Sequence, residues 1–83
     1  MINQREIDYA ISIVQNDIYY FVNYKNQLKK FSIDNRATIT KVNMNKIFSE
    51  IERIVIYLQK LKNQEQELLN LLDKFYYGNN SNE

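Results

Sequence analysis

The chain has 83 residues and a formal net charge of +1, enough for one small domain. It contains no cysteine and no histidine, which excludes disulfides, thiolate chemistry and the ordinary zinc sites. The longest apolar runs are five residues each, whereas a membrane span needs roughly 20. With no signal-peptide pattern at the start, we expect an intracellular, cytoplasmic protein without a membrane span.

The first predicted element is a helix over residues 3–31. Its apolar side chains recur at alternating steps of four and three residues, the spacing of a packed helix seam, and Lys25 is the one interruption. The seam consists of Ile7, Ile11, Val14, Ile18, Phe21 and Leu28. Because the chain has no proline, nothing breaks this helix internally.

The same helix carries a second set of apolar residues, which we call the lateral stripe. On a helical wheel it is turned by roughly 130° from the seam. Its members are Tyr9, Ile13, Tyr20, Tyr24 and Phe31. A single antiparallel neighbour covers only one of these two surfaces. We therefore expect the lateral stripe to be buried against another chain.

Residues 32–42 are predicted to connect two helices. Ser32, Asp34 and Asn35 favour turns, and the β-branched residues that follow count modestly against helix. Thr40 or Asn43 is expected to cap the next helix. Three alternatives stay open: a short extended piece, a small β-hairpin around residues 34–35, and an earlier start of the second helix.

The second predicted helix covers residues 43–77 and completes a single hairpin domain, residues 1–78. Its seam keeps the same alternation, and Glu65 is the one interruption. The seam consists of Ile47, Ile51, Ile54, Leu58, Leu61, Leu68, Leu72 and Phe75. Gly78 is expected to end the helix in a left-handed conformation. Residues 79–83 are expected to be a disordered polar tail.

The predicted fold is therefore all-α, with two long antiparallel helices in a helical hairpin. Met44, Phe48 and Val55 widen the second seam on one side, so both helices have more apolar surface than one contact covers. The expected assembly is a homodimeric four-helix bundle or a coiled-coil-like assembly. Its predicted interface consists of Tyr9, Ile13, Tyr20, Tyr24, Phe31, Phe48 and Val55.

The end of the second helix is a further candidate surface. If Phe31 lies near Val42, then Ile7 lies near Gln66, and residues 70–77 project beyond the first helix. Such a projecting segment needs a second subunit or a different protein to cover it. The candidate partner-binding residues are Leu71, Phe75, Tyr76 and Tyr77.

The sequence offers little for catalysis. The serines have no histidine as a base, and the neighbouring carboxylates Glu50 and Glu52 diverge on a helix because they are two residues apart. One glycine cannot make a glycine-rich phosphate loop. We therefore expect no enzyme, no cofactor and no metal site.

Charge is distributed unevenly along the chain. Residues 25–46 carry six basic side chains against Asp34, a net charge of +5, while residues 1–24 and 47–83 each carry −2. This basic segment suits nucleic acid or an acidic protein, but we favour the simpler interpretation of a solvated bend, because charges spread over two helix ends form no nucleic-acid motif. The candidate contacts are Lys29, Lys30, Arg36 and Lys41.

These features predict a small protein–protein interaction module, a regulator, inhibitor or assembly subunit that acts as a dimer. The alternative is a nucleic-acid-binding hairpin dimer that uses the basic connection. Seven tyrosines favour an interface, because tyrosine buries a large ring while its hydroxyl stays wet. Abundant Asn, Ile, Lys and Tyr, which have AT-rich codons, indicate an AT-rich genome.

Overall fold

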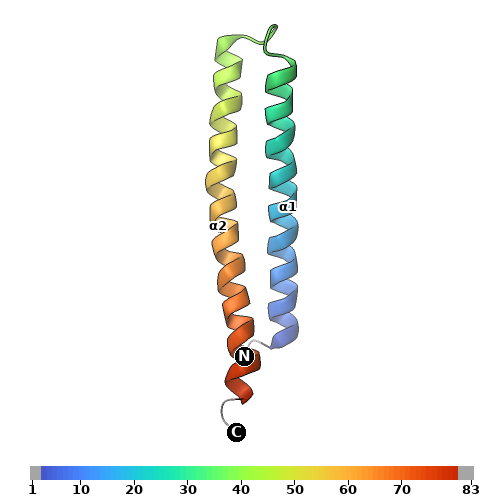
Figure 1. The fold of residues 1–83 in the computed structure, drawn as a ribbon, viewed down its shortest axis with the longest axis vertical. Coiled ribbons are helices and arrows are strands. Elements are labelled where there is room, and N and C mark those ends of the chain that lie inside the picture. Colours follow the sequence, from blue (N-terminus) through green and yellow to red (C-terminus); the bar gives the residue numbers. More distant parts are fainter. Residues whose placement is uncertain (1–2, 81–83) are drawn as a thin grey trace.

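The structure, a computed structural model, describes residues 3–80. It consists of two helices, α1 (Gln4–Asp34) and α2 (Lys41–Asn80), which run antiparallel and are joined by a turn over residues 35–40 (Figure 1). The molecule is a rod of 66 × 18 × 16 Å. The predicted all-α hairpin is confirmed, and residues 3–80 contain no strand.

Helix α1 begins at a polar cap and ends later than predicted. The Asn3 side chain accepts a hydrogen bond from the backbone N–H of Glu6 at 2.9 Å, which satisfies one free donor of the first turn. At the other end the helix continues through Asp34, three residues beyond the predicted boundary. Ser32 fits inside the helix because its hydroxyl donates to the Lys29 carbonyl at 2.7 Å.

The turn is short and closed by backbone hydrogen bonds. The N–H groups of Thr38 and Ile39 both donate to the Asn35 carbonyl, at 3.0 and 2.9 Å. The Thr40 hydroxyl then accepts from the N–H of Asn43 at 3.2 Å. Thr40 is therefore the residue that caps α2, and α2 begins at Lys41, two residues earlier than predicted.

Helix α2 also extends further than predicted at its C-terminal end. It passes through Gly78 and ends at Asn80, so the glycine lies within the helix instead of terminating it. The backbone of Asn79 and Asn80, which was expected to belong to a disordered tail, is helical. The rest of that predicted tail, residues 81–83, lies outside the described residues.

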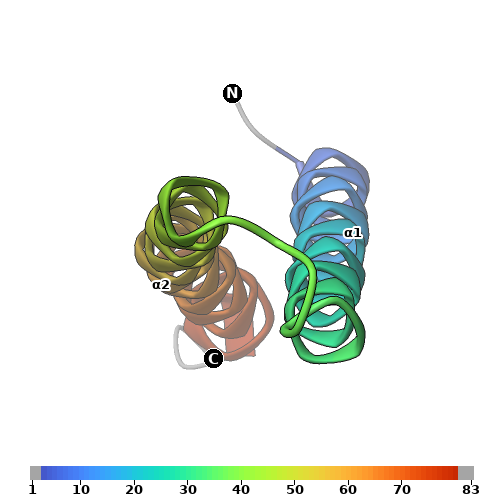
Figure 2. The ribbon, with the colours of Figure 1, turned by 90° about the horizontal axis from the view of Figure 1, so that it is seen from above.

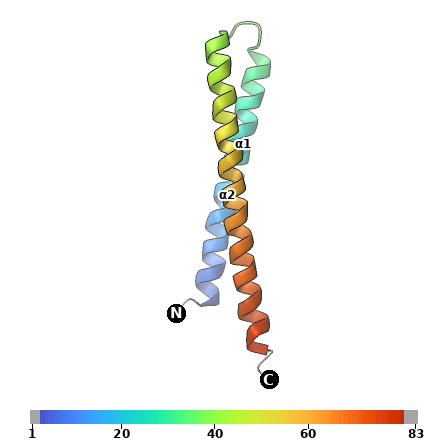
Figure 3. The same ribbon diagram turned by 90° about the vertical axis from the view of Figure 1, so that its left-hand side faces the viewer.

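The core lies along the predicted seams. Ile54, Leu58 and Leu61 of α2 form a buried cluster. The half-buried side chains packed against that cluster come from α1: Val14, Ile18, Phe21, Val22, Tyr24 and Leu28. Ile7 and Ile11 are buried nearer the open end of the hairpin. The two helices cross at a small angle, as seen from above and from the side (Figures 2 and 3), which is typical of seams packed in a coiled-coil-like manner.

The register of the two helices differs from the prediction. Phe21 contacts Tyr57, and the Gln4 side chain donates a hydrogen bond to the Tyr76 hydroxyl. Ile7 therefore lies beside residues 71–75 and not beside Gln66. The cause is the longer α1, which moves the turn toward the C-terminus. Only the last part of α2 extends past the start of α1 (Figure 1).

Candidate functional site

The lateral stripe is an array of apolar side chains on α1 that α2 leaves largely uncovered. Tyr9 is 69%, Tyr20 63%, Phe31 50% and Ile13 44% exposed. Tyr24, the fifth member, is half-buried and packs against the core cluster. The stripe spans most of the helix, and its residues share one side of it because they are spaced by multiples of a helical turn. Exposed large apolar side chains in such an array are typical of an interface.

Three aromatic rings connect the lateral stripe to the core. Tyr20 meets Phe21 edge to face with ring centroids 5.1 Å apart, and Phe21 meets Tyr57 in the same way at 4.9 Å. Tyr57 of α2 is 43% exposed and therefore borders the same surface as the stripe. Sequence analysis missed Tyr57, although its place in the apolar run of residues 54–58 was a usable signal.

The seven residues predicted to form one interface lie on two surfaces. Tyr57 lies on the Phe21 side of the hairpin. Val55 is two residues earlier, a rotation of about 200° around α2, so it lies on the opposite flank of that helix. Phe48 is seven residues before Val55 and shares its face. Both residues are exposed, but on the opposite side of the hairpin from the lateral stripe. One flat partner surface cannot cover both sets.

Two of the C-terminal candidate residues, Leu71 and Phe75, lie beside the start of α1 instead of projecting past it. Leu71, Lys74 and Phe75 line a groove of about 270 Å³ whose floor includes the buried Ile7. Phe75 is half-buried, and Tyr76 accepts the hydrogen bond from Gln4. These two side chains are therefore engaged within the chain.

Three members of that group keep exposed surface. Tyr77 is 71%, Tyr76 46% and Leu71 40% exposed. The prediction that residues 70–77 are uncovered was wrong in its register. Ile7 lies beside this segment and covers part of the surface that was expected to be free. The apolar surface that remains exposed to a partner at this end of α2 is therefore smaller than the sequence suggested.

The basic candidate residues surround the turn. Lys29, Lys30, Arg36 and Lys41 are all exposed, and they come from the end of α1, the turn and the start of α2. Within residues 3–80 a single ion pair is present, between Arg53 and Glu50 at 3.5 Å, so it involves none of these four. The turn end of the rod thus presents free positive charge.

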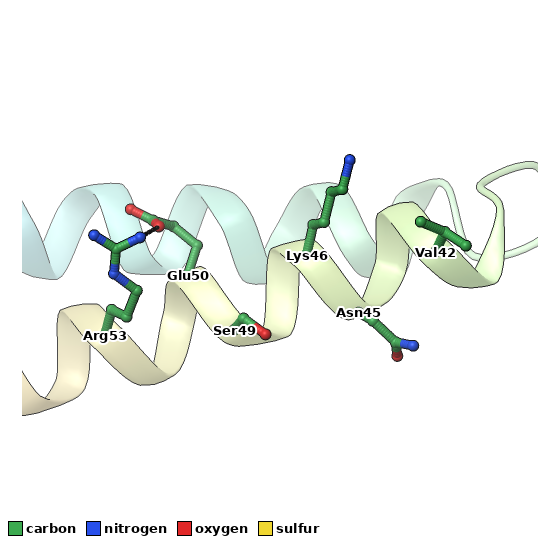
Figure 4. Close-up of a pocket in the computed structure, with 6 residues that line it drawn as sticks. All are labelled: Val42, Asn45, Lys46, Ser49, Glu50 and Arg53. Carbon is green, nitrogen blue, oxygen red and sulfur yellow. Dashed lines mark ion pairs between the residues drawn. The ribbon is translucent and has the colours of Figure 1, made fainter.

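The groove nearest this basic end lies along α2 alone. It measures about 550 Å³ and is lined by side chains from four successive turns of that helix (Figure 4). They are Val42, Asn45, Lys46, Ser49, Glu50 and Arg53. As Figure 4 shows, Glu50 and Arg53 pair with each other in this groove, while Lys46 and Asn45 point in different directions. Among the described residues, no group of three or more metal-ligating side chains gathers anywhere.

The fold defines an all-α helical hairpin in which apolar surface is exposed on both sides of the helix pair. No known family model matches the chain, and no curated protein or solved structure matches it either. Among residues 3–80, neither helix has the length and apolar character that crossing a membrane requires. The functional argument therefore depends on the exposed surfaces alone.

Proposed function

We propose that the protein is a small non-enzymatic interaction module that acts as a homodimer, in the role of a regulator, an inhibitor or an assembly subunit. The observation that supports this proposal best is the exposure of the lateral stripe on α1. Burial of one large apolar side chain stabilises an assembly by roughly 1.5–3 kcal/mol, so several such residues suffice for a specific contact.

The small core supports the same proposal. Five apolar residues are buried within the described hairpin, namely Ile7, Ile11, Ile54, Leu58 and Leu61. A core of this size supplies little stability to a chain of 83 residues, and small domains commonly gain the rest from association. A second copy on the lateral stripe would enlarge the buried core without any change in the hairpin itself.

The test is a double substitution in the lateral stripe, Ile13→Glu with Tyr20→Glu. Both side chains are exposed in the hairpin, so the two glutamates leave the packing between α1 and α2 intact. In a dimer they would be buried without partners, which is strongly unfavourable. We expect sedimentation equilibrium to show a dimer for the wild type and a monomer for this variant.

The matched control is Gln15→Glu with Asn26→Glu. It adds the same two charges to α1, but at exposed polar positions turned by roughly 140° from the lateral stripe. This control should remain a dimer. If the stripe instead served a different protein, the wild type would sediment as a monomer and its melting temperature would not depend on protein concentration.

A second candidate function is the binding of nucleic acid at the turn. The observation that favours it is the set of four exposed, unpaired basic residues around residues 35–40. Neutralising Lys29, Lys30, Arg36 and Lys41 to Gln would remove up to four phosphate contacts. The affinity of the wild type for nucleic acid should fall steeply with salt. The slope of log affinity against log salt concentration should be smaller for the variant. Binding that is weak and equally salt-dependent in both proteins would exclude this candidate.

A further inference from the structure

The two outermost members of the lateral stripe are placed symmetrically about its middle residue. Tyr9 lies eleven residues before Tyr20, and Phe31 lies eleven residues after it. The mate of Ile13 is Gln27 and the mate of Tyr24 is Asn16, each at equal distance from Tyr20. Rotation by 180° about Tyr20 therefore places Tyr9 opposite Phe31, while Ile13 and Tyr24 lie opposite exposed polar side chains at the same interface.

The charge of α1 has opposite signs toward the two ends of the helix. From Gln4 to Tyr24 the helix carries Arg5 against three acidic residues, Glu6, Asp8 and Asp17, a net charge of −2. From Lys25 to Asp34 it carries three lysines against Asp34, a net charge of +2. Two copies packed head to tail therefore place each acidic half beside a basic half.

We infer that the second copy docks along α1 head to tail, with the twofold axis at Tyr20. This inference rests on the self-association proposed above and adds its orientation and register. In this arrangement Tyr9 of one chain packs against Phe31 of its partner at both ends, and the two Tyr20 rings meet at the centre. A parallel arrangement would place the two basic halves together, which opposes association.

The orientation also defines which surfaces the dimer uses. Tyr57 borders the lateral stripe through Phe21 and lies at the edge of this interface. Phe48 and Val55 lie on the opposite side of the hairpin and stay outside it. The interface is isologous, so it closes after two copies and does not propagate into a filament.

Disulfide trapping tests this orientation, and the chain suits the method because it has no cysteine of its own. Three single variants are needed: Tyr9→Cys, Tyr20→Cys and Phe31→Cys. All three positions are exposed in the hairpin, so the substitutions leave the core untouched. In the inferred dimer the two copies of residue 9 lie about 33 Å apart along the helix, far beyond the reach of a disulfide.

The expected result is specific. Tyr20→Cys should oxidise to a covalent dimer by itself, whereas Tyr9→Cys and Phe31→Cys should do so only when the two variants are mixed. Cross-linking of Tyr9→Cys to itself, and of Phe31→Cys to itself, would establish a parallel dimer and overturn the inference. A wild-type dimer with no cross-link in any combination would also overturn it, since the interface would lie elsewhere. A wild-type monomer would instead contradict the proposed self-association.

A second measurement leaves the lateral stripe intact. Arg5 is exposed and lies outside the stripe, so Arg5→Cys can carry a nitroxide spin label without any change in the aromatic residues. The two labels should be about 45 Å apart along the axis in the head-to-tail dimer. In a parallel dimer they would be separated only by the width of two adjacent helices. A short distance would therefore contradict the inference even if a cysteine in the stripe weakened the dimer.

Discussion

Phe21 of α1 meets Tyr57 of α2 edge to face, with ring centroids 4.9 Å apart and ring planes inclined by 80°. Phe21 also contacts Tyr20 of the lateral stripe, so one ring lies between the core and the surface that we propose to be the interface. This contact determines which side of α2 borders the lateral stripe. It therefore also separates Tyr57 from Val55, two residues earlier, as members of different surfaces.

The first prediction concerns the energy of this aromatic contact. A double-mutant cycle with Phe21→Leu and Tyr57→Leu should give a coupling free energy of roughly 0.5–1.5 kcal/mol, because edge-to-face rings interact beyond the area that they bury. Urea unfolding at one fixed protein concentration provides the measurement. The reference cycle pairs Phe21→Leu with Tyr77→Leu and should be additive. Equal coupling in the two cycles would show that the ring contact does not form.

The second prediction concerns the start of α2. Thr40→Ala should lower the free energy of unfolding by about 1 kcal/mol, because the N–H of Asn43 loses the hydroxyl that it donates to. Thr40→Ser should restore most of that loss. The matched control is Thr38→Ala, whose hydroxyl makes a longer hydrogen bond, 3.3 Å, to the Asn35 carbonyl. Thermal unfolding followed by circular dichroism compares the three variants, and equal losses for Thr40→Ala and Thr38→Ala would place the cap elsewhere.

The third prediction concerns the C-terminal end. Phe75→Ala should lower the free energy of unfolding by roughly 1.5–3 kcal/mol, because the ring helps to cover the buried Ile7. Tyr77→Ala should change it by less than about 0.5 kcal/mol, since that ring is mostly exposed. Urea unfolding measures both values. A comparable loss in the two variants would mean that Tyr77 is buried as well, against a second chain.

The two helices were predictable from the sequence because their seams keep one periodicity over many turns. The lateral stripe was also predictable, since the positions of Tyr9 and Phe31 on a helix depend only on their spacing. The end of α1 was missed because Ser32 and Asp34 favour turns in general, while here the Ser32 hydroxyl bonds back to the helix. Local propensity is a weak guide at such boundaries.

The separation of Phe48 and Val55 from the lateral stripe was not predictable from one helix at a time. Which flank of α2 lies beside which flank of α1 depends on how each helix is rotated in the hairpin. That rotation is visible only in a contact between helices, here the one between Phe21 and Tyr57. The register was missed for a related reason, because it depends on where the turn lies, and α1 continues to Asp34.

The measurement that tests the central claim most directly is the mass of the wild-type protein by sedimentation equilibrium at micromolar concentration. If the lateral stripe is an interface between two copies, the mass should be twice that of the 10.1 kDa chain, and the Ile13→Glu, Tyr20→Glu variant should return to the mass of one chain. A wild-type protein that is fully helical and yet sediments at 10.1 kDa would contradict the account.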